Sequence, residues 1–389
     1  MSRAVYLDYA ATAPLLPEVK AAMIEALEAG YGNASALHSA GHVASCAIEE
    51  ARASVARLIN AEPEEIIFTS GGSEANNTVA EIFRGQKVAT SAIEHPSVLE
   101  SMRARAGECR IIPVDKAGRI KLEQVPEDVD LVSIMLANNE LGTLEPVAEV
   151  VKRCKKHNIL VHTDATQAIG KIKVDVQALD VDYLTLSAHK LGGPIGVGAL
   201  YVHKGAPYRP LIIGGHQERK RRAGTSNTLG IIGLGVAAKY AWDNWTCVAY
   251  AEKVRPLRDE LKRRILQAIP YSSCNSPEEG CLPNILNMSF QAAEGESIQL
   301  YLDAEGIMVS TGSACAAGDI KPSHVLMAVT GDAEKAHSSI RFSLGLEATK
   351  ADIDRVMEVL PGIIKKLQAI STVPLSNVSC TSDNTMKEI

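Results

Sequence analysis

The sequence has few aromatic residues, no excess of basic charge and no long apolar run. Aromatic side chains make up 4% of its 389 residues, and the formal net charge is -6 at pH 7. Since a protein that mainly binds nucleic acid presents a basic face to phosphate, this mild acidic balance argues against DNA or RNA as the main partner. No stretch approaches the ~18 consecutive apolar residues of a membrane span. We therefore expect neither direct nucleic-acid binding nor a membrane partner.

The cysteines also lack a recognisable pattern. The eight cysteines lie at positions 46, 109, 154, 247, 274, 281, 315 and 380. No two form the Cys-x(2–4)-Cys half of a zinc site, which argues against a metal. The first residues, MSRAVYLDYA, lack the basic-then-apolar order of a secretory signal. We expect a cytoplasmic protein with free thiols, each by default a small buried side chain.

Between residues 60 and 205, short β-rich runs alternate with helical stretches, which is the pattern of parallel α/β units. Strands are expected at residues 66–70, 87–93, 110–114, 131–136, 159–165, 183–187 and 198–202. Several are apolar without alternation, as strands buried on both faces are. The sequence therefore predicts an α/β fold whose large domain, residues 14–250, has a seven-stranded, mainly parallel sheet.

After residue 225 the pattern changes to long helical stretches, which reach residue 269 and which we expect Pro256 to interrupt. A compact α+β region follows. Its strands are expected at residues 285–290, 307–310 and 338–344, and its helices at 296–305, 323–329 and 351–370. We predict a smaller α+β C-terminal domain built from residues 1–13 and 251–370, and a flexible tail at 371–389 that is rich in Ser, Thr and Asn.

Residues 183–194, YLTLSAHKLGGP, place Ser187, His189 and Lys190 directly after a predicted strand. In open α/β sheets, ligands bind at the carboxyl ends of the strands. A partly desolvated lysine at that edge can act as an amine nucleophile and form a Schiff base. If Lys190 stood alone, a surface lysine after a strand would be the simpler interpretation.

The preceding predicted strand ends at Asp164, and Gln167 follows at the same edge of the sheet. A pyridoxal 5'-phosphate (PLP) enzyme needs an acid that keeps the ring nitrogen protonated, so that the ring can act as an electron sink. Asp164 suits that role, and the Gln167 amide could hydrogen-bond the ring hydroxyl. As an isolated residue, Asp164 would more simply cap a helix.

Residues 68–77, FTSGGSEANN, combine a strand, a glycine turn and the start of a helix. The free backbone N–H groups and the dipole at a helix N-terminus favour an anion, so Gly72 and Ser73 are candidates for holding a phosphate. By itself such a turn is a weak signal. A second glycine pattern at residues 233–238 is not a dinucleotide fingerprint, because no strand precedes it.

Two further strands end in polar side chains. His95 follows the strand at 87–93, and its imidazole could stack on a planar cofactor and move protons. The low aromatic content leaves few other candidates for that stacking. Asn139 ends the next strand at the same edge. In isolation, either residue would more simply cap a loop.

In their order along the chain, these motifs resemble those of the cysteine desulfurases of the NifS/IscS type, which are class V aminotransferases of PLP fold type I. The resemblance covers nearly the whole chain, including YLDYAATAP at residues 6–14 and SSIRFSLG at 338–345. It implies that Lys190 is the Schiff-base lysine and that Asp164, Gln167 and His95 contact the ring. The resemblance places Gly72, Ser73, Ser187 and His189 at the phosphate, Asn139 near both the cofactor ring and the substrate, and Asn33 near the substrate.

Two more matches concern a partner subunit and the substrate. Thr225, in the loop at 214–227, resembles a threonine that reaches the PLP phosphate of the partner subunit, which implies a homodimer; the alternative is a basic solvated loop. Arg341 resembles the arginine that grips the substrate carboxylate through a bidentate fork, and the alternative is an ordinary salt bridge.

Cys315 decides the type of reaction. Its segment, STGSACAAG at residues 310–318, consists of small residues and glycines, which predicts an exposed loop whose thiol can ionise and attack. By resemblance, this is the loop of the catalytic cysteine. The implied reaction converts L-cysteine to L-alanine and leaves a persulfide on Cys315, whose sulfur passes to an iron–sulfur scaffold or a tRNA-thiolation protein.

Two alternatives stay open at this level. In another PLP reaction, such as that of an aminotransferase or a selenocysteine lyase, Cys315 would be incidental. A scaffold or inactive partner could retain the fold alone, although the intact set of Lys190, Asp164 and Cys315 argues against that. Residues 375–389 do not match the scaffold-docking C-terminus expected of the housekeeping type, so the sulfur acceptor stays open.

Overall fold

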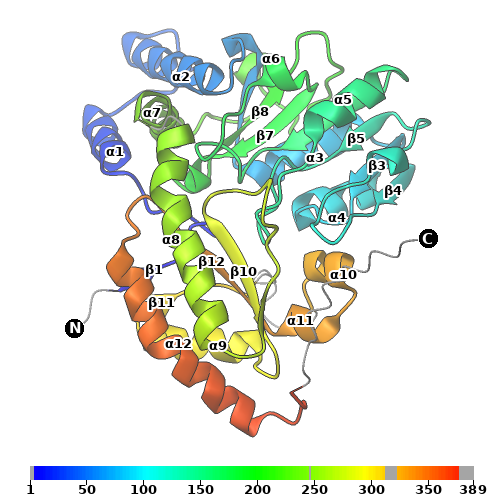
Figure 1. Ribbon diagram of the computed structural model, residues 1–389. Helices are drawn as coiled ribbons and strands as arrows, with labels where there is room; N and C mark the ends of the chain where they lie inside the picture. The colour runs from blue at the N-terminus through cyan, green and yellow to red at the C-terminus, as the bar shows by residue number, and fades with distance from the viewer. Residues whose placement is uncertain (1–3, 245–246, 312–321, 376–389) are drawn as a thin grey trace.

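A seven-stranded sheet forms the centre of the computed structural model, which describes residues 4–244, 247–311 and 322–375 (Figure 1). Its strand order is β2 (Ile66–Thr69), β8 (Gly198–Val202), β7 (Tyr183–Ser187), β6 (Leu160–Asp164), β5 (Leu131–Ser133), β3 (Lys87–Ser91) and β4 (Glu108–Ile112). Strand β8 is antiparallel to both of its neighbours, and the pairs from β7 to β4 are parallel. The predicted seven-stranded, mainly parallel sheet is therefore confirmed.

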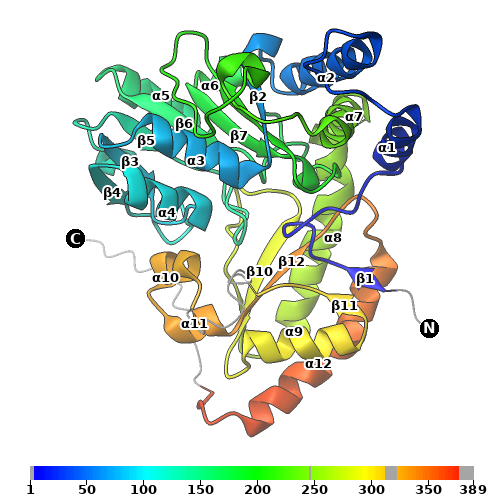
Figure 2. The same ribbon diagram turned by 180° about the vertical axis from the view of Figure 1, so that it is seen from behind.

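Helices cover both faces of this sheet (Figures 1 and 2). Helices α3 (Gly72–Ile82) and α4 (Pro96–Arg105) pack on one face, and α2 (Ser39–Leu58), α5 (Val147–Lys155) and α7 (Thr228–Asn244) pack on the other. Within β2, Ile66 and Phe68 join the core on the α2 face, whereas Ile67 joins the core on the α3 face. Because neighbouring side chains on a strand point to opposite faces, this double coverage explains the apolar runs without alternation.

A second, smaller unit lies beside the sheet and has its own hydrophobic core (Figure 1). It contains the antiparallel sheet β12-β10-β9, with β12 at Ser339–Ser343, β10 at Ile285–Phe290 and β9 at Ser272–Cys274. Helices α8 (Cys247–Ala268), α9 (Gly295–Ala304) and α12 (Lys350–Ile370) pack around it, and α10 (His324–Thr330) and α11 (Ala333–His337) follow at one side. This unit therefore has a core separate from that of the central sheet, and the division of the chain into domains at the expected bounds stays a prediction.

The N-terminal segment joins this smaller unit through a short parallel pair of strands. Strand β1 (Val5–Tyr6) pairs with β11 (Ile307–Met308). Beyond it, the backbone N–H of Ala13 donates to the carbonyl of His189, 2.8 Å away, so the chain then crosses to the central sheet. Residues 4–13 therefore connect the two cores.

The expected interruption at Pro256 is wrong, because α8 runs through it without a break. A proline inside a helix removes one backbone N–H and leaves the carbonyl four residues earlier without its partner. Here Pro256 and Glu252 are both exposed, so water can bond that carbonyl. The cost of the proline is thereby reduced enough for the helix to continue.

The expectation of buried thiols is wrong for Cys46, which is exposed. The buried residues of α2, such as Ala44, Ile48 and Val55, recur at three- and four-residue intervals along one stripe, and Cys46 lies on the opposite face. Cys154 and Cys281 are buried, and Cys109 and Cys274 are half-buried. The side chains of the cysteines at 247, 315 and 380 lie outside the described residues, as does the tail from residue 376.

Among the residues that the structure describes, no helix is both long enough and apolar enough to cross a membrane.

Candidate active site

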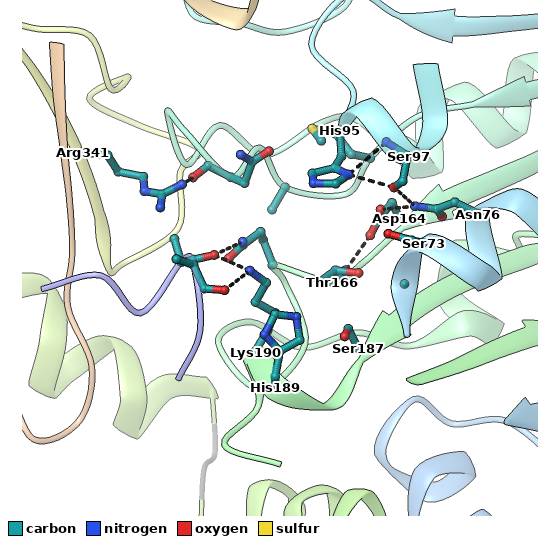
Figure 3. A pocket seen from close by; sticks show the side chains of 17 residues that line it. Ser73, Asn76, His95, Ser97, Asp164, Thr166, Ser187, His189, Lys190 and Arg341 are labelled. Carbon is teal, nitrogen blue, oxygen red and sulfur yellow. Dashed lines mark hydrogen bonds between the residues drawn. The ribbon is translucent and has the colours of Figure 1, made fainter. Parts of the chain in front are cut away.

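A cavity of about 290 Å³ lies where the carboxyl ends of the parallel strands face the smaller unit (Figure 3). Strands β6 and β7 end beside it, the first turns of α3 and α4 enter it, and β12 contributes one arginine. The predicted residues that line it are Gly72, Ser73, His95, Asn139, Asp164, Gln167, Ser187, His189, Lys190 and Arg341. Side chains that are far apart in the sequence therefore meet in a single cavity.

Three predicted residues are not among those that line the cavity. Thr225 is exposed in its loop, and only the family resemblance implies a place for it in the site of a partner subunit. Asn33 is also exposed, and its Oδ1 accepts a hydrogen bond from the backbone N–H of Ser35 at 2.9 Å. Cys315 lies outside the described residues. The roles of all three stay predictions.

The amine of Lys190 is held by the N-terminal segment. Its Nζ donates to the carbonyl oxygens of Ala10 and Ala11, both at 2.6 Å. Gln167 Nε2 donates to the same Ala10 carbonyl at 2.8 Å. The other end of that amide, Gln167 Oε1, is buried without a hydrogen-bond partner in the described chain. Gln167 thus has an unused acceptor near the Lys190 amine.

Asp164 is held in one orientation by two donors. Its Oδ1 accepts from the backbone N–H of Thr166 at 2.9 Å, and its Oδ2 accepts from Nδ2 of Asn76 at 2.8 Å. Because each oxygen has its own donor, the plane of the carboxyl group is fixed. Asp164 can therefore present a negative charge to the cavity from a fixed position.

The start of α3 forms a cradle for an anion. Gly71 precedes the helix with φ 149°, in a region that favours glycine, and no side chain caps the first turn. A Cβ at Gly72 would lie 3.3 Å from the hydroxyl of Thr166, which is itself buried without a hydrogen-bond partner among the described residues. The open N–H groups and this unused hydroxyl suit a phosphate oxygen.

Burial keeps the two imidazoles of the cavity neutral. It lowers the pKa of His95. The charge of Asp164 opposes this shift, and repulsion from Lys190 and His324 acts in the same direction as burial. It lowers the pKa of His189 to about 4, and the charges of Lys190 and Lys171 act in the same direction. Near neutral pH, both rings can therefore donate or accept a hydrogen bond without carrying a charge.

Arg341 reaches the cavity from β12 with its guanidinium already partly engaged. Its Nη1 donates to the carbonyl of Asn139 at 2.9 Å, and its Nη2 forms a salt bridge with Asp8 at 2.8 Å. Its Nε is buried and has no hydrogen-bond partner within the described residues. The salt bridge considered as an alternative is present, and it leaves the arginine oriented toward the cavity.

The cavity also contains residues that the sequence did not single out. Asn76, Ser97 and Thr166 contribute side-chain groups, and Ala10 and Ala11 contribute carbonyl oxygens. A backbone carbonyl has no signature in the sequence. The signal available for Asn76 was its position one turn after the glycine cradle, which brings it to the same face of α3 as Ser73.

Lys171 is a buried cation behind Lys190. Lys171 is only 4% exposed, and its Nζ donates a hydrogen bond to the backbone carbonyl of Lys190 at 3.4 Å. Burial lowers its pKa from 10.5 to about 7, and repulsion from Lys190 adds to the shift. The unfolded chain therefore binds this proton more tightly than the folded protein, and folding is penalised most below pH 7.

We expect Lys171→Met to raise the free energy of unfolding by an amount on the order of a few kcal/mol near neutral pH. The gain should shrink as the pH rises from about 7 to about 10, since the lysine then becomes neutral in the unfolded chain as well. Urea unfolding across that pH range measures it, with Lys173→Met as the control because that side chain is 80% exposed. A gain that does not change with pH would contradict the charge-based explanation.

Comparison with known proteins gives the same family throughout. The model of the aminotransferase class-V family matches residues 5–356. Over 384 residues the chain is 46% identical to the protein named cysteine desulfurase IscS from Dictyoglomus turgidum, covering 95% of this chain and 97% of that one. It is 41% identical over 384 residues to the protein named cysteine desulfurase NifS from Azotobacter vinelandii, covering 94% of each.

Solved structures agree with these relatives. A structure named NifS-like protein matches with a TM-score of 0.86 and 38% identity, and the match covers 94% of this chain and 100% of that one. A structure of SspA in complex with cysteine matches with a TM-score of 0.76 and 31% identity, covering 89% and 100%. The expected fold class is therefore confirmed.

Proposed function

Because the chain belongs to the class-V aminotransferases, among the cysteine desulfurases of the IscS and NifS type, we propose that it converts L-cysteine to L-alanine and holds the released sulfur as a persulfide on Cys315. The observation that carries this proposal is the convergence of Lys190, Asp164 and Arg341 on one cavity. An amine, an acid and a carboxylate-binding cation are the groups that an amino-acid substrate requires.

The cavity suits PLP as the cofactor. When bound, the PLP ring acts as an electron sink for charge that develops beside the amino group of the substrate. Asp164 would face the ring nitrogen, and the unused Oε1 of Gln167 would accept from the ring hydroxyl. The residues that would hold the phosphate are Gly72, Ser73, Ser187 and His189, with the hydroxyl of Thr166 beside them and Thr225 contributed by the partner subunit of a homodimer.

Each residue at the site has a separate role in the proposed reaction. Lys190 would hold the cofactor through its amine, and the same amine, when free, would move a proton at the substrate. Arg341 binds the substrate carboxylate, with Asn139 and Asn33 nearby. The thiolate of Cys315 attacks the substrate sulfur: a sulfur–sulfur bond forms, the carbon–sulfur bond breaks, and the bonding electron pair stays on carbon. That carbon takes up one proton to become the methyl group of alanine, and alanine leaves.

The persulfide is then available to a sulfur acceptor. We propose that the acceptor is a protein, either an iron–sulfur cluster scaffold or a tRNA-thiolation protein. A terminal persulfide sulfur can be transferred by attack of a thiolate of the acceptor, which leaves Cys315 as a free thiol for the next turnover.

The decisive assay compares products. A desulfurase forms alanine and acid-labile sulfide or persulfide in equal amounts from L-cysteine, with no keto acid present. An aminotransferase would form amino-transfer products only when a keto acid is added, and a selenocysteine lyase would act on selenocysteine and leave cysteine unchanged. Either of these results would overturn the proposal.

Arg341→Lys should raise KM for L-cysteine by about 10- to 100-fold, because an ammonium cannot form the paired bonds of a guanidinium with a carboxylate. The kcat value should change less, since the lost contact holds the substrate in its ground state as well. Steady-state alanine formation measures both. Arg355→Lys is the control, because Arg355 pairs with Glu305 and Glu358 on the outside of α12. An unchanged KM would show that Arg341 does not bind the substrate carboxylate and serves only in the salt bridge with Asp8.

A further inference from the structure

A chain of hydrogen bonds in the wall of the cavity joins Asp164 to His95 (Figure 3). Nδ2 of Asn76 lies 2.8 Å from Oδ2 of Asp164 and 2.9 Å from Oγ of Ser97. Oγ of Ser97 in turn lies 2.8 Å from Nδ1 of His95. Asn76 is almost completely buried, at 1% exposure, so these bonds form away from water.

The directions of these bonds are fixed by the groups that can only accept or only donate. Since a carboxylate can only accept, the NH₂ group of Asn76 is the end that faces Asp164. The same nitrogen faces Ser97, so the Ser97 oxygen accepts from it. The serine hydroxyl proton is then left for Nδ1 of His95, the other atom within reach.

A second donor reaches the same nitrogen of His95. The backbone N–H of Ser97 donates to Nδ1 at 3.1 Å, which makes the imidazole the N-cap of α4. A backbone N–H cannot accept, so Nδ1 carries no proton in this arrangement. The positive end of the α4 dipole also disfavours a second proton on the ring, as burial does. The neutral ring therefore has its proton on Nε2.

The other side of the ring faces the reaction space. In Figure 3, Ser97 lies on one side of the His95 imidazole, and the open part of the cavity lies on the other, with Lys190 and Arg341 across it. The charged or titratable groups that act on His95 are Asp164, Lys190 and His324. An Nε2–H group thus points away from its helix cap and toward the place of the substrate.

We propose that Ser97 and Asn76 are positioning residues that hold His95 as the neutral Nε2–H tautomer, so that His95 offers the substrate a donor and not an acceptor. This inference rests on the proposed desulfuration and assigns the proton transfers within it. His95 supplies a proton or a hydrogen bond from Nε2, and the Lys190 amine is the group that removes the proton from the substrate carbon.

The tautomer can be measured without turnover. Nitrogen-15 labelled histidine in the cofactor-bound protein gives separate resonances for Nδ1 and Nε2, and those of His95 are assigned by their loss in His95→Gln. We expect a protonated Nε2 and an unprotonated Nδ1 in the unmodified protein. A protonated Nδ1 would overturn the proposal.

Substitution of the relay tests whether it controls this state. Ser97→Ala removes one donor to Nδ1, so the pKa of His95 should rise and kcat for alanine formation should fall about tenfold, with little change in KM. Ser97→Thr keeps the hydroxyl and should restore both properties. Asn76→Ala should move the resonances of His95 in the same direction as Ser97→Ala.

Ser101→Ala is the matched control on the same helix. Its hydroxyl donates to the backbone carbonyls of Ser97 and Val98 in α4, and within the described part of the chain it forms no hydrogen bond with the imidazole. It should leave the tautomer, the pKa of His95 and kcat unchanged. If Ser97→Ala behaves like this control, the positioning role is wrong. Absence of alanine formation in the unmodified protein would instead count against the proposed function, since the tautomer is read separately.

Discussion

Lys190→Ala should remove the yellow colour of the cofactor-bound protein and lower kcat for alanine formation by about 10²–10⁴-fold or more. The amine of Lys190 is the group that would bind PLP covalently and then move a proton at the substrate. Ala10 and Ala11 hold that amine with two carbonyl oxygens at 2.6 Å, so its position does not depend on a loop side chain. A methyl group in its place keeps the cavity and removes both functions.

The measurement is a visible absorbance spectrum together with the alanine assay. Lys173→Ala serves as the control, because this lysine has an exposed side chain that pairs with Asp175. It should keep both the colour and the activity. A Lys190→Ala protein that stays yellow and turns over cysteine would remove Lys190 from its proposed role.

Cys315→Ser should keep the colour of the cofactor but lose the persulfide and at least about 10²-fold of the alanine formation from L-cysteine. A serine hydroxyl is of similar size, yet it neither ionises near neutral pH nor accepts a sulfur atom in a stable form. Binding of cofactor and substrate should therefore survive, and only the transfer of sulfur should fail. A protein that keeps the cofactor colour but loses sulfur transfer distinguishes the role of Cys315 from that of Lys190.

Cys46→Ser is the control for this prediction, because Cys46 is an exposed thiol on the outer face of α2. It should change neither the persulfide yield nor the rate. If alanine formation continued in Cys315→Ser at the rate of the unmodified protein, Cys315 would be incidental, and another PLP reaction would fit the cavity better.

The long elements of the fold were predictable from sequence because each is marked by its own residues. Strand β2 shows buried side chains on both faces and a glycine turn after its end, and β10 was expected at the residues where it occurs. A strand was also expected at residues 307–310, where β11 occurs, but β1 and its pairing with β11 could not be found in this way. Each has two residues, and what makes them strands is the pairing of Val5 with Ile307 across the whole chain.

Some residues of the candidate site were likewise predictable from the sequence, and others were not. Asp164 and Lys190 were predictable because each lies at or just after the end of a parallel strand, and these ends share one edge of the sheet. Ser97 and Asn76 do not lie at the end of a strand, and the only signal for Asn76 is its place one turn after the glycine turn. They become functional candidates only when α3 and α4 pack side by side and bring both to His95 and Asp164.

The central claim is that sulfur leaves cysteine as a persulfide on Cys315, and mass spectrometry of the protein after brief exposure to L-cysteine tests it most directly. The account predicts that the peptide with Cys315 gains the mass of one sulfur atom, that a thiol reductant removes it, and that alanine appears in equal amount. Alanine formation with an unmodified Cys315 peptide, or with the added sulfur on another cysteine, would contradict it.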